Sequence, residues 1–332
     1  MAYRKLALTI VAGQSGPPRA AQYADGVKTS TQREPEARPA AAQSTARRPP
    51  WRALLVAARP RQWIKNLLVL AVPAAAGALD EPGVIGATAL AFAAFCLASA
   101  GTYLLNDVAD READRRHPVK RRRPVAAGEV SATTATVTAA ALLVAACLVG
   151  WLADPGLAAV VVAYVVLTTA YSRGLKHVAI FDIATVAAGF FLRAVAGGVA
   201  SDLFISKWFL ILSGGGSLFL VTAKRYAELR RGGADARRVL GEYSEDYLRA
   251  MLATTAGVVV VAYCIWCFEE RAGAAPSALT TASAVPFVLG IMRYGLLVDQ
   301  GHGEEPEVLL LTDRTLLALA AACLGLLALG TL

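Results

Sequence analysis

Long apolar stretches alternate with short polar ones from residue 66 to the end of the chain. The clearest stretch runs from Val84 to Leu105, 22 residues without a charge. About 20 consecutive apolar residues span a bilayer as an α-helix, so the pattern predicts an all-α integral membrane protein. Nine segments fit, of which the first is short and contains Pro73: 66–79, 84–105, 133–152, 157–172, 178–199, 207–223, 250–268, 278–297 and 314–332.

Lysine and arginine are unevenly distributed among the connecting segments. The segments 106–132 and 224–249 carry seven each, whereas the alternate segments 80–83 and 153–156 carry none. Basic residues mark the cytoplasmic side of a membrane protein. The sequence therefore predicts nine transmembrane helices in the plasma membrane, with the amino terminus and the active site on the cytoplasmic face.

Composition supports the membrane assignment and separates the first fifty residues from the rest. Of 332 residues, 56% are hydrophobic and 17% are charged, against about 25% charged in soluble proteins. Residues 1–50 are rich in Ala, Pro, Arg and Ser, which is typical of disorder. We expect a basic, disordered cytoplasmic tail over 1–50 and a catalytic membrane domain over 51–332. The lipid bilayer is an expected partner and nucleic acid is not; a homo-oligomer is left open.

The clearest candidate for a functional site is a polar cluster at the end of the segment 84–105, where this segment meets water. Asn106 begins a cluster in which Asp107, Asp110 and Asp114 are spaced i, i+3 and i+7, within about 60° on one helical stripe. Carboxylates this close repel one another unless a cation holds them, and hard oxygen ligands suit Mg²⁺. A solvated loop is the alternative, but it does not explain why helical spacing, membrane position and a following arginine run coincide. We therefore predict that Mg²⁺ is a cofactor, bound by these four residues.

Basic and polar clusters follow at the predicted cytoplasmic ends of other segments. They could hold phosphate groups, although the first of them could equally anchor a helix at the membrane interface. The candidate substrate-binding residues in these clusters are Gln62, Lys65, Asn66, Arg122, Arg123, Tyr171, Ser172 and Lys176.

A further basic cluster leaves the sixth segment, and two tyrosines precede the seventh. Lys224 and Glu228 are spaced i, i+4 and could merely pair on a helix surface. A cationic cluster facing a metal-binding one, however, suits a substrate with phosphate at both ends. We predict substrate contacts from Lys224, Arg225, Tyr226, Glu228, Tyr243 and Tyr247, and catalytic roles for Asp107, Asp110 and Lys224.

Two charged residues lie inside the predicted fifth helix. Asp182 is costly in an apolar segment unless it is paired. Arg193 follows eleven residues later, so both side chains face about the same way. For Arg193, pairing with another helix is at least as well supported as catalysis.

The pattern Asn106-Asp107-x-x-Asp110-x-x-x-Asp114, followed by Arg123-Pro124 and Gly128-x-Val-Ser131, resembles the first motif of the UbiA-type polyprenyltransferase superfamily. The resemblance covers about residues 52–332. It implies a nine-helix bundle whose cytoplasmic aspartate motifs bind a diphosphate through Mg²⁺.

The segment that takes the place of the second motif departs from the pattern of that superfamily. Typical members carry a second DxxxD between helices six and seven, where this chain has the basic Lys-Arg-Tyr-Ala-Glu at 224–228. Together with Arg-Pro-x-Gln-Trp-x-Lys-Asn at 59–66 and Tyr-Ser-x-x-Leu-Lys at 171–176, it resembles the decaprenyl-phosphate phosphoribosyltransferase branch. This implies transfer of 5-phosphoribose from phosphoribosyl diphosphate to a polyprenyl phosphate. The product, decaprenylphosphoryl-5-phosphoribose, serves cell-wall arabinan synthesis.

The charges of phosphoribosyl diphosphate favour this branch over a prenyltransferase, and the placement of the polar clusters disfavours a transporter. Phosphoribosyl diphosphate carries a diphosphate at one end and a monophosphate at the other, so both clusters would have an anion. A UbiA-type prenyltransferase with an aromatic acceptor would leave the second basic cluster without one. A transporter would place polar groups on a path to both faces, whereas these clusters lie on one face apart from Arg193 and Lys207.

Overall fold

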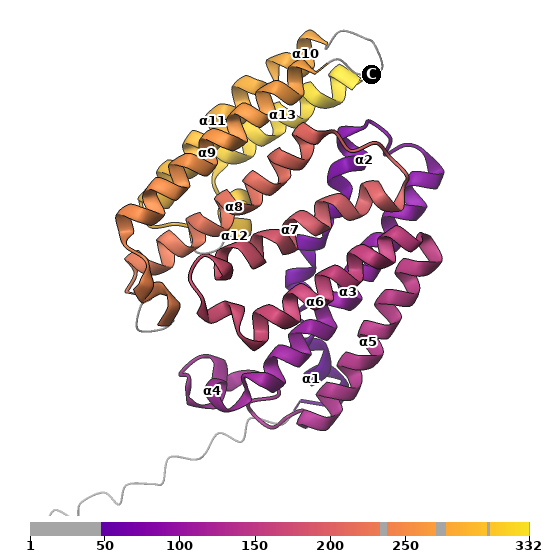
Figure 1. Cartoon of the computed structure of the whole chain (residues 1–332), viewed down its shortest axis with the longest axis vertical. Coiled ribbons are helices and arrows are strands. Elements are labelled where there is room, and N and C mark those ends of the chain that lie inside the picture. Colours follow the sequence, from indigo (N-terminus) through magenta and orange to yellow (C-terminus); the bar gives the residue numbers. More distant parts are fainter. Residues whose placement is uncertain (1–47, 233–237, 270–276, 304–305, 332) are drawn as a thin grey trace, which may run out of the picture. The chain divides into compact units, whose positions relative to one another are not determined.

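The computed structural model describes residues 48–232, 238–269, 277–303 and 306–331, and these form helices and turns without a β-strand. The all-α prediction is therefore confirmed for this part of the chain, whereas the predicted tail lies almost wholly outside it. In chain order the helices are α1 (Pro50–Ala57), η1 (Pro60–Leu70), α2 (Ala71–Ala75), α3 (Pro82–Ala109), α4 (Arg111–Arg116), η2 (Lys120–Arg122), α5 (Ala132–Ala153), α6 (Pro155–Arg173), η3 (Leu175–His177), α7 (Phe181–Ala200), α8 (Lys207–Arg230), η4 (Arg238–Glu242), α9 (Glu245–Phe268), α10 (Ala278–Ala282), α11 (Ala284–Asp299), α12 (Pro306–Thr312) and α13 (Arg314–Thr331) (Figure 1).

Six helices in the described ranges are long and apolar enough to cross a membrane, which indicates a multi-pass membrane protein. They are α3, α5, α6, α7, α9 and the combined α10–α11 over Ala278–Asp299. The number of nine spans and the orientation of the chain stay predictions. The first predicted segment is a 3₁₀-helix followed by the five-residue α2. Pro73 lies inside α2, where its ring removes a backbone donor and crowds the preceding turn.

Capping residues explain the tight connection between α5 and α6. Asp154 is the single residue between these helices, and its Oδ1 accepts hydrogen bonds from Gly156 N at 2.7 Å and Leu157 N at 3.1 Å. Pro155 follows at the first helical position, where its missing amide hydrogen is not needed. The two helices pack against each other across this one-residue link and so run antiparallel, which returns the end of α6 to the side where α5 begins.

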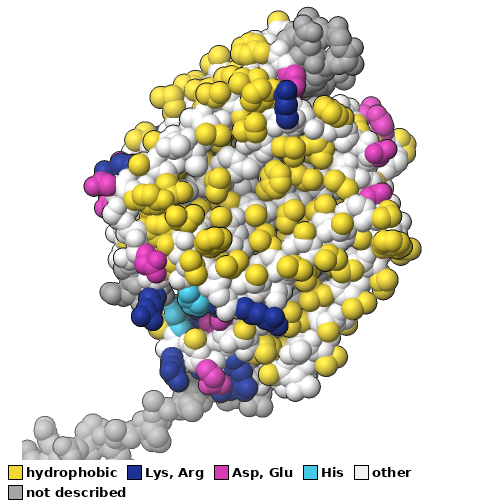
Figure 2. Space-filling view, viewed as in Figure 1, with side chains coloured by type: hydrophobic (Ala, Val, Ile, Leu, Met, Phe, Trp, Pro, Cys, Tyr) yellow, Lys and Arg dark blue, Asp and Glu magenta, His cyan; other side chains and the backbone are white. Residues whose placement is uncertain are grey.

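The helices pack as neighbours in two groups along the chain. In the first, α3 packs against α5, α6 and α7; in the second, α8 packs against α9, and α11 packs against α13, with α7 and α8 in contact between the groups (Figure 1). Hydrophobic side chains cover most of the face shown in Figure 2, and several basic side chains gather toward the end that carries α4. The apolar exterior fits a lipid environment.

Gly197 in α7 allows η1 to approach closely. A methyl group at this position would collide with the carbonyl oxygen of Val69, which is fully buried. Val69 lies three residues beyond Asn66, and Gly197 lies about one turn beyond Arg193. This close packing brings the side chains of Asn66 and Arg193 into contact, with 2.7 Å between Oδ1 and Nε.

We expect Gly197→Ala to lower the free energy of unfolding by about 1–3 kcal/mol, because the added methyl group overpacks the contact with η1. The measurement is thermal unfolding of the purified protein in detergent. Gly257→Ala in α9 is the matched control, since its added methyl group meets no described atom within 4 Å and alanine favours the helix. Equal melting temperatures for the two variants would contradict the packing argument.

Candidate active site

Asp107 lies in the last turn of α3, is 1% exposed, and is held by two arginines from distant segments. Its Oδ1 accepts hydrogen bonds from Arg59 and from Arg123, the latter at 3.3 Å. Arg59 stands between α1 and η1 in a left-handed backbone conformation, with φ of 53°. Arg123 also donates to Asp114 Oδ2 at 2.7 Å. The predicted aspartate cluster and two of the predicted basic segments therefore meet at one place.

Asp110, the remaining aspartate of the cluster, pairs with the connection between α6 and α7. Asp110 forms the end of α3, and its Oδ1 accepts a hydrogen bond from Lys176 Nζ at 2.6 Å. Lys176 lies in η3, 66 residues further along the chain. The fold thus places the lysine of the Tyr-Ser-x-x-Leu-Lys segment beside the aspartates.

Whether these residues suit a divalent cation can be judged from Asp107. Its Oδ2 is buried and has no hydrogen-bond partner, so one hard oxygen ligand is unused. Within the described ranges, no three acidic, histidine or cysteine side chains come close enough together to hold a metal by themselves. Magnesium binds few protein carboxylates and takes its remaining ligands from water and substrate phosphates. The donor chemistry therefore fits Mg²⁺, provided that a substrate supplies further oxygen ligands.

A polar cavity of about 240 Å³ adjoins the cluster, between η1, α3, α6 and α7. The predicted substrate-binding residue Lys65 and the predicted metal ligand Asn106 line it. Arg59, from the basic segment 59–66, lines it as well. The predicted Tyr171 and Ser172 also line it, at the end of α6. The other polar residues of its lining are Thr102, Tyr103, Tyr164, Thr168, Thr185 and Arg193.

Most of this second set was missed in the sequence, although a signal for it exists. Tyr164, Thr168 and Tyr171 are spaced i, i+4 and i+7, which places them on one face of an otherwise apolar helix. Asp182, Thr185 and Arg193 form a similar face on α7. Polar stripes on membrane helices indicate a shared interior cavity. Of these residues, only Asp182 and Arg193 were expected from the sequence to share a helix face, and the stripe on α6 was missed.

The second basic cluster forms a buried network with α7. Asp182 is fully buried and accepts hydrogen bonds from Arg225 Nε at 2.8 Å and from the Tyr243 hydroxyl at 2.6 Å. Arg225 also donates to Glu228 at 2.8 Å. Burial and the hydrogen bond to Asp182 raise the pKa of Tyr243, so its hydroxyl stays protonated as a donor. Asp182 is paired, as its position inside an apolar segment required.

Other predicted substrate-binding residues lie in different surroundings. Tyr226 is 1% exposed, and its hydroxyl donates to Asp299 at 3.1 Å and not into the polar cavity. Asn66 is fully buried and bonds to Cys96 and Arg193, whereas Gln62 is half-buried. Arg122 and Tyr247 are exposed. Lys224 lies 3.9 Å from Glu228, so the pairing considered for these two residues is present. Substrate contacts of all these residues stay predictions.

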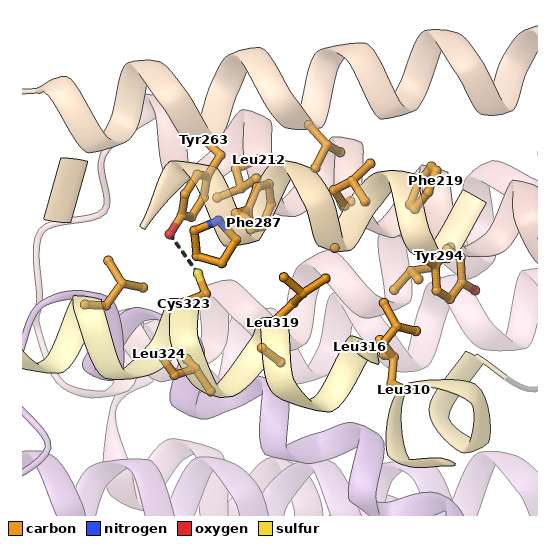
Figure 3. A pocket seen from close by; sticks show the side chains of 18 residues that line it. Leu212, Phe219, Tyr263, Phe287, Tyr294, Leu310, Leu316, Leu319, Cys323 and Leu324 are labelled. Atoms are coloured by element: carbon orange, nitrogen blue, oxygen red, sulfur yellow. Dashed lines mark hydrogen bonds between the residues drawn. The ribbon is translucent and has the colours of Figure 1, made fainter. Parts of the chain in front are cut away.

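An apolar cavity of about 460 Å³ lies between α8, α9, α11 and α13 (Figure 3). Tyr263 stacks on Phe287 with 3.7 Å between the ring centroids, and its hydroxyl lies 3.2 Å from Cys323 Sγ. The remaining side chains around the cavity are almost entirely hydrocarbon, among them Leu316 and Leu319. Such a lining fits a hydrocarbon chain and disfavours a charged group.

Comparison with known proteins identifies the family. The profile of the UbiA prenyltransferase family matches residues 67–309. The chain belongs to the UbiA prenyltransferase family. It is 44% identical over 286 residues to the decaprenyl-phosphate phosphoribosyltransferase of Mycolicibacterium smegmatis, which covers 82% of this chain and 90% of that protein. Identity to the protein of the same name from Mycobacterium tuberculosis H37Rv is 45% over 273 residues, or 80% of this chain and 90% of that protein.

Solved structures show the same UbiA fold. A UbiA homologue from Archaeoglobus fulgidus, bound to GPP and Mg²⁺, superposes with a TM-score of 0.64 and covers 84% of this chain and 98% of its own, at 15% identity. A structure of digeranylgeranylglyceryl phosphate synthase superposes with a TM-score of 0.58 and covers 85% of this chain and 98% of its own, at 15% identity. The predicted superfamily and branch are confirmed, and a divalent metal is present in a solved UbiA structure.

We expect Asp182→Ala to lower the free energy of unfolding by about 3 kcal/mol, because it leaves the buried Arg225 without one of its two carboxylates. Thermal unfolding in detergent is the measurement. The double variant Asp182→Leu/Arg225→Met should recover most of the loss, since it removes both charges. Asp246→Ala is the control, because its pair with Arg249 is exposed and exposed pairs contribute little. A loss no larger than that of the control would contradict the assignment.

Proposed function

We propose that this protein transfers 5-phosphoribose from phosphoribosyl diphosphate to a polyprenyl phosphate, such as decaprenyl phosphate, and releases diphosphate. The observation that carries the proposal is the identity of 44–45% to decaprenyl-phosphate phosphoribosyltransferases over nine-tenths of their length. The polar cavity supports it, because its lining is rich in cationic and hydroxyl groups that suit a phosphorylated sugar.

The reaction exchanges one bond at the anomeric carbon of the sugar. The bond from this carbon to the diphosphate oxygen breaks, and the electron pair leaves with the diphosphate. A phosphate oxygen of the lipid forms the new bond to the same carbon. Because a phosphate monoester is largely ionised near neutral pH, the chain need not supply a strong general base. Its task is to orient both substrates and to stabilise negative charge.

The aspartate cluster is the proposed diphosphate site. We assign Asp107, Asp110, Asp114 and Asn106 to a bound Mg²⁺, supported by the unpartnered Asp107 Oδ2. The metal supplies positive charge that stabilises the leaving diphosphate. Arg59 and Arg123 already pair with Asp107, and we propose that they and Lys176 turn part of their hydrogen bonding to substrate phosphates.

The remaining predicted residues are proposed to position the sugar and the lipid head group. Lys65, Tyr171 and Ser172 line the cavity and can donate hydrogen bonds to phosphate or ribose oxygens. Lys224 is 39% exposed while the adjacent Arg225 is held in its buried pair, so Lys224 is the better placed of the two to contact a substrate phosphate.

The membrane setting completes the proposal. We propose a nine-helix bundle in the plasma membrane, with the amino terminus and the polar cavity on the cytoplasmic side. The apolar cavity between α8, α9, α11 and α13 supports this proposal, because it offers room for an isoprenoid chain. The product would serve arabinan synthesis in the cell wall.

A prenyltransferase acting on an aromatic acceptor is the second candidate, favoured by the likeness to the UbiA structure that holds GPP. One assay separates the two. Purified protein in detergent receives Mg²⁺, decaprenyl phosphate and labelled phosphoribosyl diphosphate, and we expect label to enter the lipid phase. Absence of lipid-phase label, together with prenyl transfer to an aromatic acid, would reverse the proposal.

We expect Asp107→Asn to reduce turnover by about 10²–10³-fold, because it weakens the stabilisation of the leaving group. The variant should still fold, since the amide oxygen of asparagine can accept the hydrogen bonds of Arg59 and Arg123. The readouts are initial rate as a function of Mg²⁺ concentration and melting temperature. Lys207→Met is the control, since Lys207 lies at the start of α8, outside the polar cavity. Full activity of the Asp107 variant at ordinary Mg²⁺ concentration would refute the metal assignment.

A further inference from the structure

Among the described residues, one arginine of the polar cavity has no acidic partner. Arg193 lies in α7 and is 6% exposed. In the described part of the chain no carboxylate lies within ion-pair distance of its guanidinium, whereas Arg59 has one such partner and Arg123 and Arg225 have two each. A charge within a membrane-spanning helix is costly, and such residues usually mark a substrate or ion site.

Arg193 lies deeper along the helices than the aspartate cluster. Its Nη2 is 3.4 Å from Ser99 Oγ, and Ser99 stands eight residues before Asp107 in α3. A rise of 1.5 Å per residue places this level about 12 Å from the aspartates. Asn106 and Arg193 both line the same cavity, so the cavity connects the two levels.

Neutral groups fix the orientation of the guanidinium. Nε donates to Asn66 Oδ1 at 2.7 Å, Nη1 to the Gly189 carbonyl at 2.6 Å, and Nη2 to the Tyr164 hydroxyl at 2.8 Å. With the longer contact to Ser99, four of the five N–H groups have acceptors among the described residues. One N–H of Nη1 has no acceptor among the described residues, and Gly189, whose carbonyl accepts the other, lines the cavity.

We propose that Arg193 is the main cation of a phosphomonoester subsite at the deep end of this cavity. A preorganised guanidinium recognises phosphate oxygens, and its unneutralised charge acts strongly in a setting of low dielectric constant. The ligand class rests on the proposed function, since both proposed substrates carry a phosphomonoester: the 5-phosphate of the donor and the head group of the lipid. The subsite is distinct from the aspartate cluster, because Arg193 binds an anion without a metal.

The first test is binding to the full-length protein in detergent without Mg²⁺. Calorimetric titration uses ribose 5-phosphate and farnesyl phosphate as probes, with ribose and farnesol as uncharged controls. We expect at least one phosphorylated probe to bind the wild-type protein and its Kd to rise at least tenfold in Arg193→Met, because a hydrogen bond to a charged group is lost. Arg193→Lys keeps the charge and should bind with intermediate affinity.

Steady-state kinetics then identify the source of the phosphate. If the donor occupies the subsite, Arg193→Met raises the KM for phosphoribosyl diphosphate at least tenfold and leaves the KM for decaprenyl phosphate unchanged. The opposite pattern assigns the subsite to the lipid head group. Lys207→Met, the control, should change neither value. A merely structural role predicts a lower melting temperature or kcat without a selective rise in either KM.

Three outcomes overturn the subsite: unchanged Kd and KM values in a folded Arg193→Met, equal effects on both KM values, or no binding of either phosphorylated probe to the wild-type protein. Absence of binding to the wild-type protein would refute the proposed subsite even if Arg193→Met does not fold. Failure of the proposed function looks different. In that case the wild-type protein transfers no phosphoribose to lipid, whereas Arg193-dependent binding of a phosphomonoester still stands.

Discussion

The polar features of this protein depend on the need to neutralise charge beside hydrocarbon. Asp107 is 1% exposed and is paired with Arg59 and Arg123, which lie 48 and 16 residues away in the chain. A buried carboxylate is tolerated only with such partners, so the pairs bring the segment before η1 and the loop before α5 onto the end of α3. These ion pairs position Arg59, which lines the edge of the polar cavity.

The same requirement organises the second basic cluster in a different way. Asp182 takes Arg225 and Tyr243 as partners and so connects α7 to α8 and to the segment before α9. Arg225 is therefore a buried structural cation, held by Asp182 and Glu228. Its neighbour Lys224 keeps 39% of its side chain exposed. Two adjacent residues of one basic motif thus have different environments, and of the two only Lys224 is exposed to any extent at the surface.

The Arg193 subsite adds a third way of treating charge. Here the guanidinium is surrounded by neutral acceptors and aromatic rings, with its centre 4.6 Å from the Tyr164 ring. The cation–π contact and the hydrogen bonds reduce the penalty of burial without neutralising the charge. A site of this kind keeps its attraction for an anion, and it lies in the cavity that Asn106 lines beside the aspartate cluster.

The sequence alone determined the helical membrane class, the family and the aspartate cluster, because apolar length and i, i+3, i+7 spacing are local properties. It also indicated that Asp182 needs a partner. Only the tertiary structure decided which charge pairs with which, since the partners of Asp107, Asp110 and Asp182 lie between 16 and 66 residues away. It likewise placed Tyr226 outside the polar cavity and Arg193 inside it. Side-chain direction around a helix follows from spacing, but what each face meets depends on how the helices pack.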